Sequence, residues 1–137
     1  MDKYIYFITP FLAWLICGIT KFAVNCIREK RLAFDLIGYG GMPSNHSAIV
    51  SSMASLIACT EGIDSPAFGA SLTLAFIVTM DANGLRKKME SHAIEINKLK
   101  DNSSPILRER IGHTKLEILC GIFIGGFLGF IISQLDL

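Results

Sequence analysis

Four long blocks of apolar residues dominate this chain, and they approach the length that an α-helix needs to cross a membrane. They cover residues 4–22, 47–59, 66–80 and 116–135, and the last two hold a single charge between them, Glu117. A soluble bundle would show polar residues at a 3.6-residue period, which 72–80 and 118–132 lack. The sequence therefore predicts an all-α integral membrane bundle of about four transmembrane helices, forming one domain over 1–137.

Positive charge is distributed unevenly between these blocks. The first connection holds Arg28, Lys30 and Arg31, the second holds no Lys or Arg, and the third, ending at Lys115, holds eight. Basic connections stay on the cytoplasmic side of a membrane. We therefore expect connections one and three to face the cytoplasm from the cell inner membrane, with both chain termini on the opposite side.

The third connection has its own pattern. Residues 84–99 carry a rough apolar stripe opposite basic residues, which predicts an amphipathic cytoplasmic helix that lies on the membrane surface or caps the site. The polar stretch 101–105 predicts a loop, and 106–111 a further short helix.

The last block carries Gly121, Gly125 and Gly129 at i, i+4 spacing, which forms a smooth helix face. Such a face serves close packing within the bundle or, alternatively, a homodimer seam. The net charge of +1, with no basic arm or aromatic RNA motif, gives no indication of nucleic-acid binding.

Residues 40–46, Gly-Gly-Met-Pro-Ser-Asn-His, precede the second apolar block. Ser44 can act as the N-cap of a helix that starts here. Unpaired N–H groups and the helix dipole make such a start an anion site, with Asn45 and His46 in the first turn. A histidine beside a bound phosphate can donate a proton to a leaving oxygen.

Further ionisable residues fall at the same predicted ends of the other blocks. Two arginines and a lysine suit the binding of phosphate oxygens. One histidine, His113, can attack phosphorus if a carboxylate holds its second ring nitrogen, and Glu117 lies four residues on, on the same helix face. The set comprises Lys21, Arg28, Asp81, Arg86, His113 and Glu117.

Four motifs in this order resemble those of the type 2 phosphatidic-acid phosphatase superfamily, which includes vanadium-dependent haloperoxidases. They are Lys21-x6-Arg28, Gly-Gly-Met-Pro-Ser-x-His-Ser-Ala at 40–48, Asp-Ala-x-Gly-Leu-Arg at 81–86 and Gly-His-Thr-x-x-Glu at 112–117. They are most similar to its small divergent branch of acid phosphatase/vanadium-dependent haloperoxidase-related membrane proteins. The resemblance runs from about residue 12 to 130.

The resemblance implies a membrane lipid phosphatase that uses no metal or other cofactor and works through a phosphohistidine. His113 would be the nucleophile, Glu117 its orienter and His46 the general acid. The phosphate would be held by Lys21, Arg28, Ser44 and Arg86. Expected substrates are phosphatidylglycerophosphate, phosphatidic acid and polyprenyl phosphates or diphosphates.

The sequence leaves alternatives open for the nucleophile, for the second arginine and for the function. The superfamily separates its second arginine from the nucleophile by five residues, which Arg86 and His92 match, but Ile96 follows where an orienting carboxylate is needed. Arg108 and Arg110 are substitutes for Arg86. Asn45, Asp81 and His92 are accessory positions; Asp81 would pair with Arg86 or a lysine. The alternative function is a non-catalytic membrane protein that retains a lipid-phosphate cradle.

Overall fold

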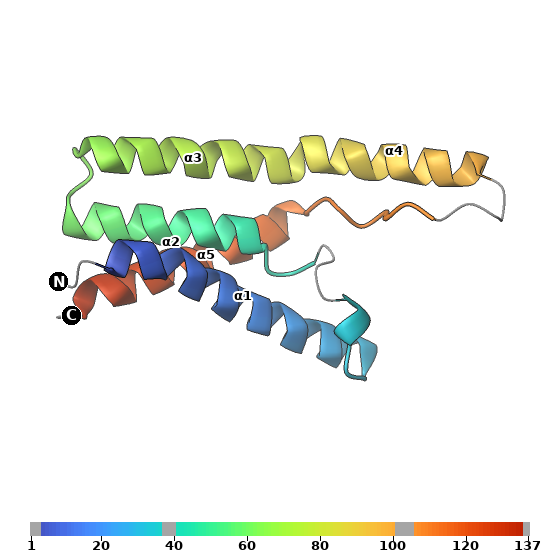
Figure 1. Cartoon of the computed structure of the whole chain (residues 1–137), viewed down its shortest axis with the longest axis horizontal. Coiled ribbons are helices and arrows are strands. Elements are labelled where there is room, and N and C mark those ends of the chain that lie inside the picture. The colour runs from blue at the N-terminus through green and yellow to red at the C-terminus, as the bar shows by residue number, and fades with distance from the viewer. Residues whose placement is uncertain (1–3, 37–40, 101–105, 136–137) are drawn as a thin grey trace.

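The computed structural model describes residues 4–36, 41–100 and 106–135, and within these ranges every regular element is a helix (Figure 1). The all-α prediction is confirmed. The elements are α1 (Ile5–Glu29), the 3₁₀ helix η1 (Phe34–Leu36), α2 (Asn45–Thr60), α3 (Pro66–Asn83), α4 (Leu85–Leu99) and α5 (Lys115–Gln134).

Helices α1, α2, α3 and α5 run alternately in opposite directions along one axis (Figure 1). The start of α1, the turn between α2 and α3 and the end of α5 lie at one end of the bundle. The end of α1, η1, the start of α2 and all of α4 lie at the other end, which we call the basic end. The grouping of connections one and three is therefore as expected.

Three helices within the described ranges are long and apolar enough to cross a membrane: α1, the combined α3–α4 and α5. Their large apolar side chains are widely exposed, Phe11, Phe76 and Phe123 among them, as expected for lipid-facing surfaces. Helix α2 has 16 residues, or about 24 Å, which falls short of the ~30 Å hydrocarbon core. The chain is thus an integral membrane bundle in which α2 is the short fourth helix.

Helix α2 is the centre of this bundle, because it packs against α1, α3 and α5. Its buried residues are mostly small, such as Ala48 and Ser52, so neighbouring helices approach closely. Side chains also link it to its neighbours: Ser55 Oγ donates to the Gly126 carbonyl of α5 at 2.7 Å. Tyr6 and Thr60 share a 2.9 Å hydrogen bond between their hydroxyls, joining α1 to α2.

The glycine face of α5 lies directly on α2. A Cβ added at Gly121, Gly125 or Gly129 would collide with the carbonyl oxygen of Ser44, Ala48 or Ser52 respectively. The face therefore serves packing within the chain. A homodimer through the same face, the alternative use, would require α2 to move away, and it stays a prediction.

Helix α4 forms where 84–99 predicts it, but it does not lie across the bundle. It continues α3 past Gly84 in nearly the same direction and extends beyond the basic end (Figure 1). Among the described residues it contacts no helix other than α3. An apolar stripe fixes which face of a helix is buried but not how the helix is oriented, and here the buried Ala93 marks that face.

Residues 106–114 return along α4 to the bundle in a non-helical conformation, so the short helix predicted at 106–111 is wrong. Its backbone groups bond to α4 instead. Asn97 accepts from the Leu107 N–H and donates to the Leu107 carbonyl, both at 2.8 Å. The loop predicted at 101–105 lies outside the described residues.

Close contact between α5 and α2 predicts a sharp difference between adjacent glycines. Gly125→Ala should lower stability by about 1–3 kcal/mol relative to Gly126→Ala, because the added methyl overlaps the Ala48 carbonyl. At Gly126 nothing lies within 4 Å of the new atom. Thermal unfolding of both variants in the same detergent measures this; equal midpoints would contradict the contact.

Candidate active site

The start of α2 is fixed by its contact with the first turn of α5. The Ser44 N–H donates to the Glu117 carbonyl at 3.0 Å, across the join that Gly121 makes possible. Ser44 is fully buried, and its Oγ caps α2 by accepting from the N–H and the hydroxyl of Ser47. The predicted N-cap is thus confirmed. This join brings His46 and His113 to the same end of the bundle.

His113 is fixed in position by burial, by a backbone hydrogen bond and by a contact of its ring. Its side chain is 4 % exposed, and its backbone N–H donates to the Ala82 carbonyl of α3 at 3.2 Å. Its Nδ1 lies 3.3 Å from Glu117 Oε2. The same oxygen accepts from the Thr114 N–H at 2.9 Å, while Thr114 Oγ1 accepts from the Glu117 N–H, which completes a capping box. The expected carboxylate partner of His113 is therefore in place.

Burial lowers the pKa of His113 below its ordinary value of 6.5, and the nearby positive charge of Lys21 lowers it further. The hydrogen bond and charge of Glu117 act in the opposite sense without cancelling the effect. The imidazole is therefore neutral near pH 7. Since a carboxylate only accepts hydrogen bonds, Nδ1 carries the proton, which leaves a lone pair on Nε2.

Positive groups surround the two histidines. Lys21 is 9 % exposed, although it carries a charge, and it interacts electrostatically with Glu117. Charges on Lys21 and Arg86 act on both His46 and His113. We call Lys21, His46, Arg86, His113 and Glu117 the histidine cluster. Its members come from four helices and the segment before α5.

The outer members of the predicted set differ in position. Asp81 pairs with Arg86, with 3.4 Å between Oδ2 and Nε, as one of the two expected pairings. Arg108 interacts with Lys21, so it also reaches the cluster. Arg28 and Arg110 are exposed, and their charges are not among those that act on His46 or His113.

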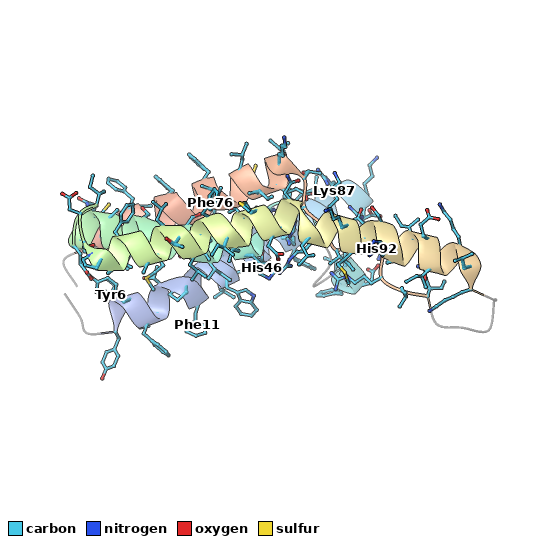
Figure 2. All side chains as sticks on the ribbon, turned by 90° about the horizontal axis from the view of Figure 1, so that it is seen from above. Tyr6, Phe11, His46, Phe76, Lys87 and His92 are labelled. Carbon is cyan, nitrogen blue, oxygen red and sulfur yellow. The ribbon has the colours of Figure 1, made fainter. Side chains whose placement is uncertain are left out.

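His92 lies outside the histidine cluster. It is exposed on α4, further from the bundle than His46 (Figure 2). Residue Ile96, one turn later on α4, offers no acceptor for its ring. In the described part of the chain, only His113 of the two candidate nucleophiles has a carboxylate partner.

One positioning residue is marked by no motif. Glu90 Oε2 on α4 accepts from the backbone N–H groups of Ile111 at 3.3 Å and Gly112 at 3.0 Å. Gly112 allows this approach, because a Cβ there would lie 3.0 Å from Lys87 Cα. Glu90 thus fixes the backbone directly before His113. In the sequence, Glu90 is one of several charged residues on the polar face of an amphipathic helix, so nothing there indicates such a role.

The histidine cluster offers cations for an anion, a held imidazole and a second, exposed histidine. These groups suit phosphoryl transfer, because cations beside an oriented imidazole can bind the oxygens of a phosphate that the imidazole attacks. Within the described ranges, no three His, Cys, Asp or Glu side chains are arranged to hold a metal ion.

Comparisons with known proteins agree with the resemblance in the sequence. The model of the divergent PAP2 family matches residues 3–128. The uncharacterized membrane protein YuiD of Bacillus subtilis (strain 168) is 30% identical over 140 residues, which cover 88% of this chain and 86% of that protein. No solved structure gives a significant match.

His113 should titrate below pH 6.5 in NMR spectra of histidine-labelled protein, with the three histidines assigned by single substitutions. Glu117→Gln should lower this pKa further, because the carboxylate favours the protonated ring. Since the unfolded chain binds the proton near pH 6.5 and the folded chain does not, stability should fall as pH drops through that value. A His113 pKa above 6.5 would contradict the buried, neutral ring.

Proposed function

We propose that this chain, which belongs to the divergent PAP2 family, is a membrane phosphatase that removes the phosphate from a lipid phosphomonoester or diphosphate. One observation carries the proposal: a buried histidine, held at Nδ1 by a carboxylate, lies among buried or half-buried cations. A binding module needs the cations but has no use for an oriented, neutral imidazole.

Lys21 and Arg86 would bind the phosphate oxygens. Both lie near the histidines, and an arginine can contact two phosphate oxygens at once. The first N–H groups of α2, next to Ser44, add partial positive charge at the same place. Asp81 holds Arg86 at its side and leaves the other guanidinium nitrogens available. Direct phosphate contacts by Arg28 and by the Ser44 hydroxyl stay predictions.

His113 Nε2 would attack phosphorus while the bond from phosphorus to the leaving oxygen breaks. The bound phosphate anion favours the protonated form of His46, which gives its proton to that oxygen, so an alcohol or a phosphate leaves. The phosphorylated imidazole keeps its Nδ1–H and carries positive charge, which the Glu117 carboxylate balances. His46 is exposed on the first turn of α2, where a leaving group can reach it.

Water then completes the cycle. Neutral His46 takes a proton from a water molecule as its oxygen attacks phosphorus, and the phosphorus–nitrogen bond breaks. Inorganic phosphate leaves, His113 returns to its neutral state and His46 is again protonated. Every proton is accounted for by these two histidines, and Glu117 stays ionised throughout.

The location of the cluster favours lipid substrates. The cluster lies at the start of α2, at the basic end of the bundle, and α1 extends further in the same direction (Figure 1). The positive-inside rule predicts that this end faces the cytoplasm. Phosphatidylglycerophosphate, phosphatidic acid and polyprenyl phosphates or diphosphates all present such a head group at the inner leaflet.

Phosphate release by detergent-purified protein, with EDTA present, tests the proposal on these three substrate classes. We expect turnover by the wild type and a loss of at least a thousandfold in His113→Ala, because the nucleophile is gone. His46→Ala should lose about 10²–10⁴-fold through the missing general acid. His92→Ala separates the two candidate nucleophiles.

Loss of turnover in His92→Ala alone would show that the Arg86–His92 spacing, not the His113–Glu117 pair, marks the nucleophile. Lipid-phosphate binding without turnover on any substrate would instead support the non-catalytic cradle.

A further inference from the structure

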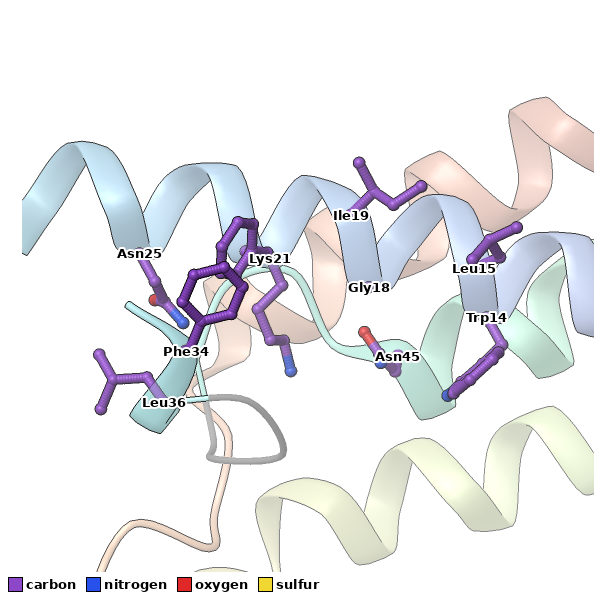
Figure 3. A pocket seen from close by; sticks show the side chains of 10 residues that line it. Trp14, Leu15, Gly18, Ile19, Lys21, Asn25, Phe34, Leu36 and Asn45 are labelled. Carbon is purple, nitrogen blue, oxygen red and sulfur yellow. The ribbon is translucent and has the colours of Figure 1, made fainter. Parts of the chain in front are cut away.

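A cavity of about 430 Å³ lies between α1, η1 and the first residue of α2, next to the histidine cluster (Figure 3). Its walls are mostly apolar: Trp14, Leu15 and Ile19 line it from α1, and Phe34 lines it from η1. The rings of Phe22 and Phe34 lie 5.1 Å apart between their centroids and join α1 to η1 there.

Lys21 belongs to both the cavity and the histidine cluster. In Figure 3 its side chain points from α1 into the space between Phe34 and Asn45. A ligand with its phosphate beside the Lys21 ammonium therefore has an apolar cavity directly adjoining its other end. Charge and polarity across the cavity match an anionic head followed by an apolar chain.

The outer side of the cavity faces the lipid-exposed surface of α1. Trp14, Leu15 and Ile19 are all at least half exposed, although they line it. In a membrane, these side chains contact hydrocarbon. An apolar chain can therefore pass from the bilayer into the cavity without crossing a polar layer.

Asn45 supplies a second, independent observation. Its Oδ1 is buried and has no hydrogen-bond partner among the described residues, and Asn45 lines the cavity. A buried acceptor left without a donor is costly. A water or a ligand hydroxyl in the cavity would satisfy it, so the cavity is built to be filled rather than to be closed by packing.

We propose that this cavity binds the first part of the apolar chain of the phosphate-bearing substrate. The inference rests on the proposed function and narrows it to substrates with a hydrocarbon chain close to the phosphate. Each methylene buried there contributes about fourfold to kcat/KM. The cavity thus makes the protein prefer phosphates with long alkyl chains over short, water-soluble ones.

Gly18 offers a direct way to fill the cavity. It lines the wall from α1, and an added Cβ would lie 3.9 Å from Asn45 Nδ2, an ordinary contact. Gly18→Leu therefore places a side chain into the cavity, and Gly18→Ala a smaller one. Gly69→Leu is the matched control, because Gly69 lies in the apolar helix α3 with nothing within 4 Å of its added Cβ.

The first measurement is the ratio of kcat/KM for octyl phosphate to that for butyl phosphate. The wild type and Gly69→Leu should give a ratio on the order of 100, from four further methylenes. Gly18→Leu should lower the ratio at least tenfold, and Gly18→Ala by less. An unchanged ratio in Gly18→Leu, with turnover retained, would overturn the cavity proposal and leave the phosphatase proposal standing.

The second measurement does not need turnover. Trp14 is the single tryptophan of the chain and lines the cavity, so a terminally brominated octyl phosphate should quench its fluorescence. We expect saturable quenching in the wild type and an apparent Kd at least tenfold higher in Gly18→Leu. That result without hydrolysis would support the cavity and overturn catalysis; non-saturable quenching identical in both proteins would overturn the cavity.

Discussion

The close approach of α5 to α2 is the contact on which the rest of the structure depends. Three glycines on one face of α5 let its backbone lie against carbonyl oxygens of α2. The contact nearest the start of both helices, Gly121 on Ser44, lets the Ser44 N–H reach the Glu117 carbonyl. The starts of the two helices are thereby joined, and each carries one histidine of the cluster.

The same join explains how a short helix serves a membrane protein. Helix α2 contributes little lipid-facing surface, because its apolar side chains are buried or half-buried among three longer helices. Along the bundle axis, α2 therefore begins short of the point where α1 ends (Figure 1). The histidine cluster forms at this N-terminus, and burial strengthens the interactions of Lys21 and His113 there. The cavity beside Lys21 lies between this cluster and the lipid-facing side of α1.

Much of this arrangement can be predicted from the sequence. The apolar blocks predict the helices, the glycine spacing predicts the close helix face, and His113-x3-Glu117 predicts the histidine–carboxylate pair. The first two patterns are local and follow from helix geometry. His113, however, precedes the N-cap Thr114 of α5, so its contact with Glu117 comes from the capping turn and not from a shared helix face. The path between Arg86 and His113 is not local: α4 runs outward as a continuation of α3, and 106–114 returns along it. Backbone hydrogen bonds to Glu90 and Asn97 stabilise that return, and neither residue lies in a motif. Because these hydrogen bonds hold the returning segment in an extended form, the helix expected at 106–111 does not form.

In the proposed mechanism, His113 forms a covalent bond to phosphorus. Its most direct test is to mix the protein with a ³²P-labelled lipid phosphate, stop the reaction in alkali within milliseconds and locate the label by peptide mapping. We expect an alkali-stable, acid-labile phosphoryl group on the peptide that contains His113, and none in Glu117→Ala. Label on His92 or His46, or turnover with no labelled protein at any time, would contradict it.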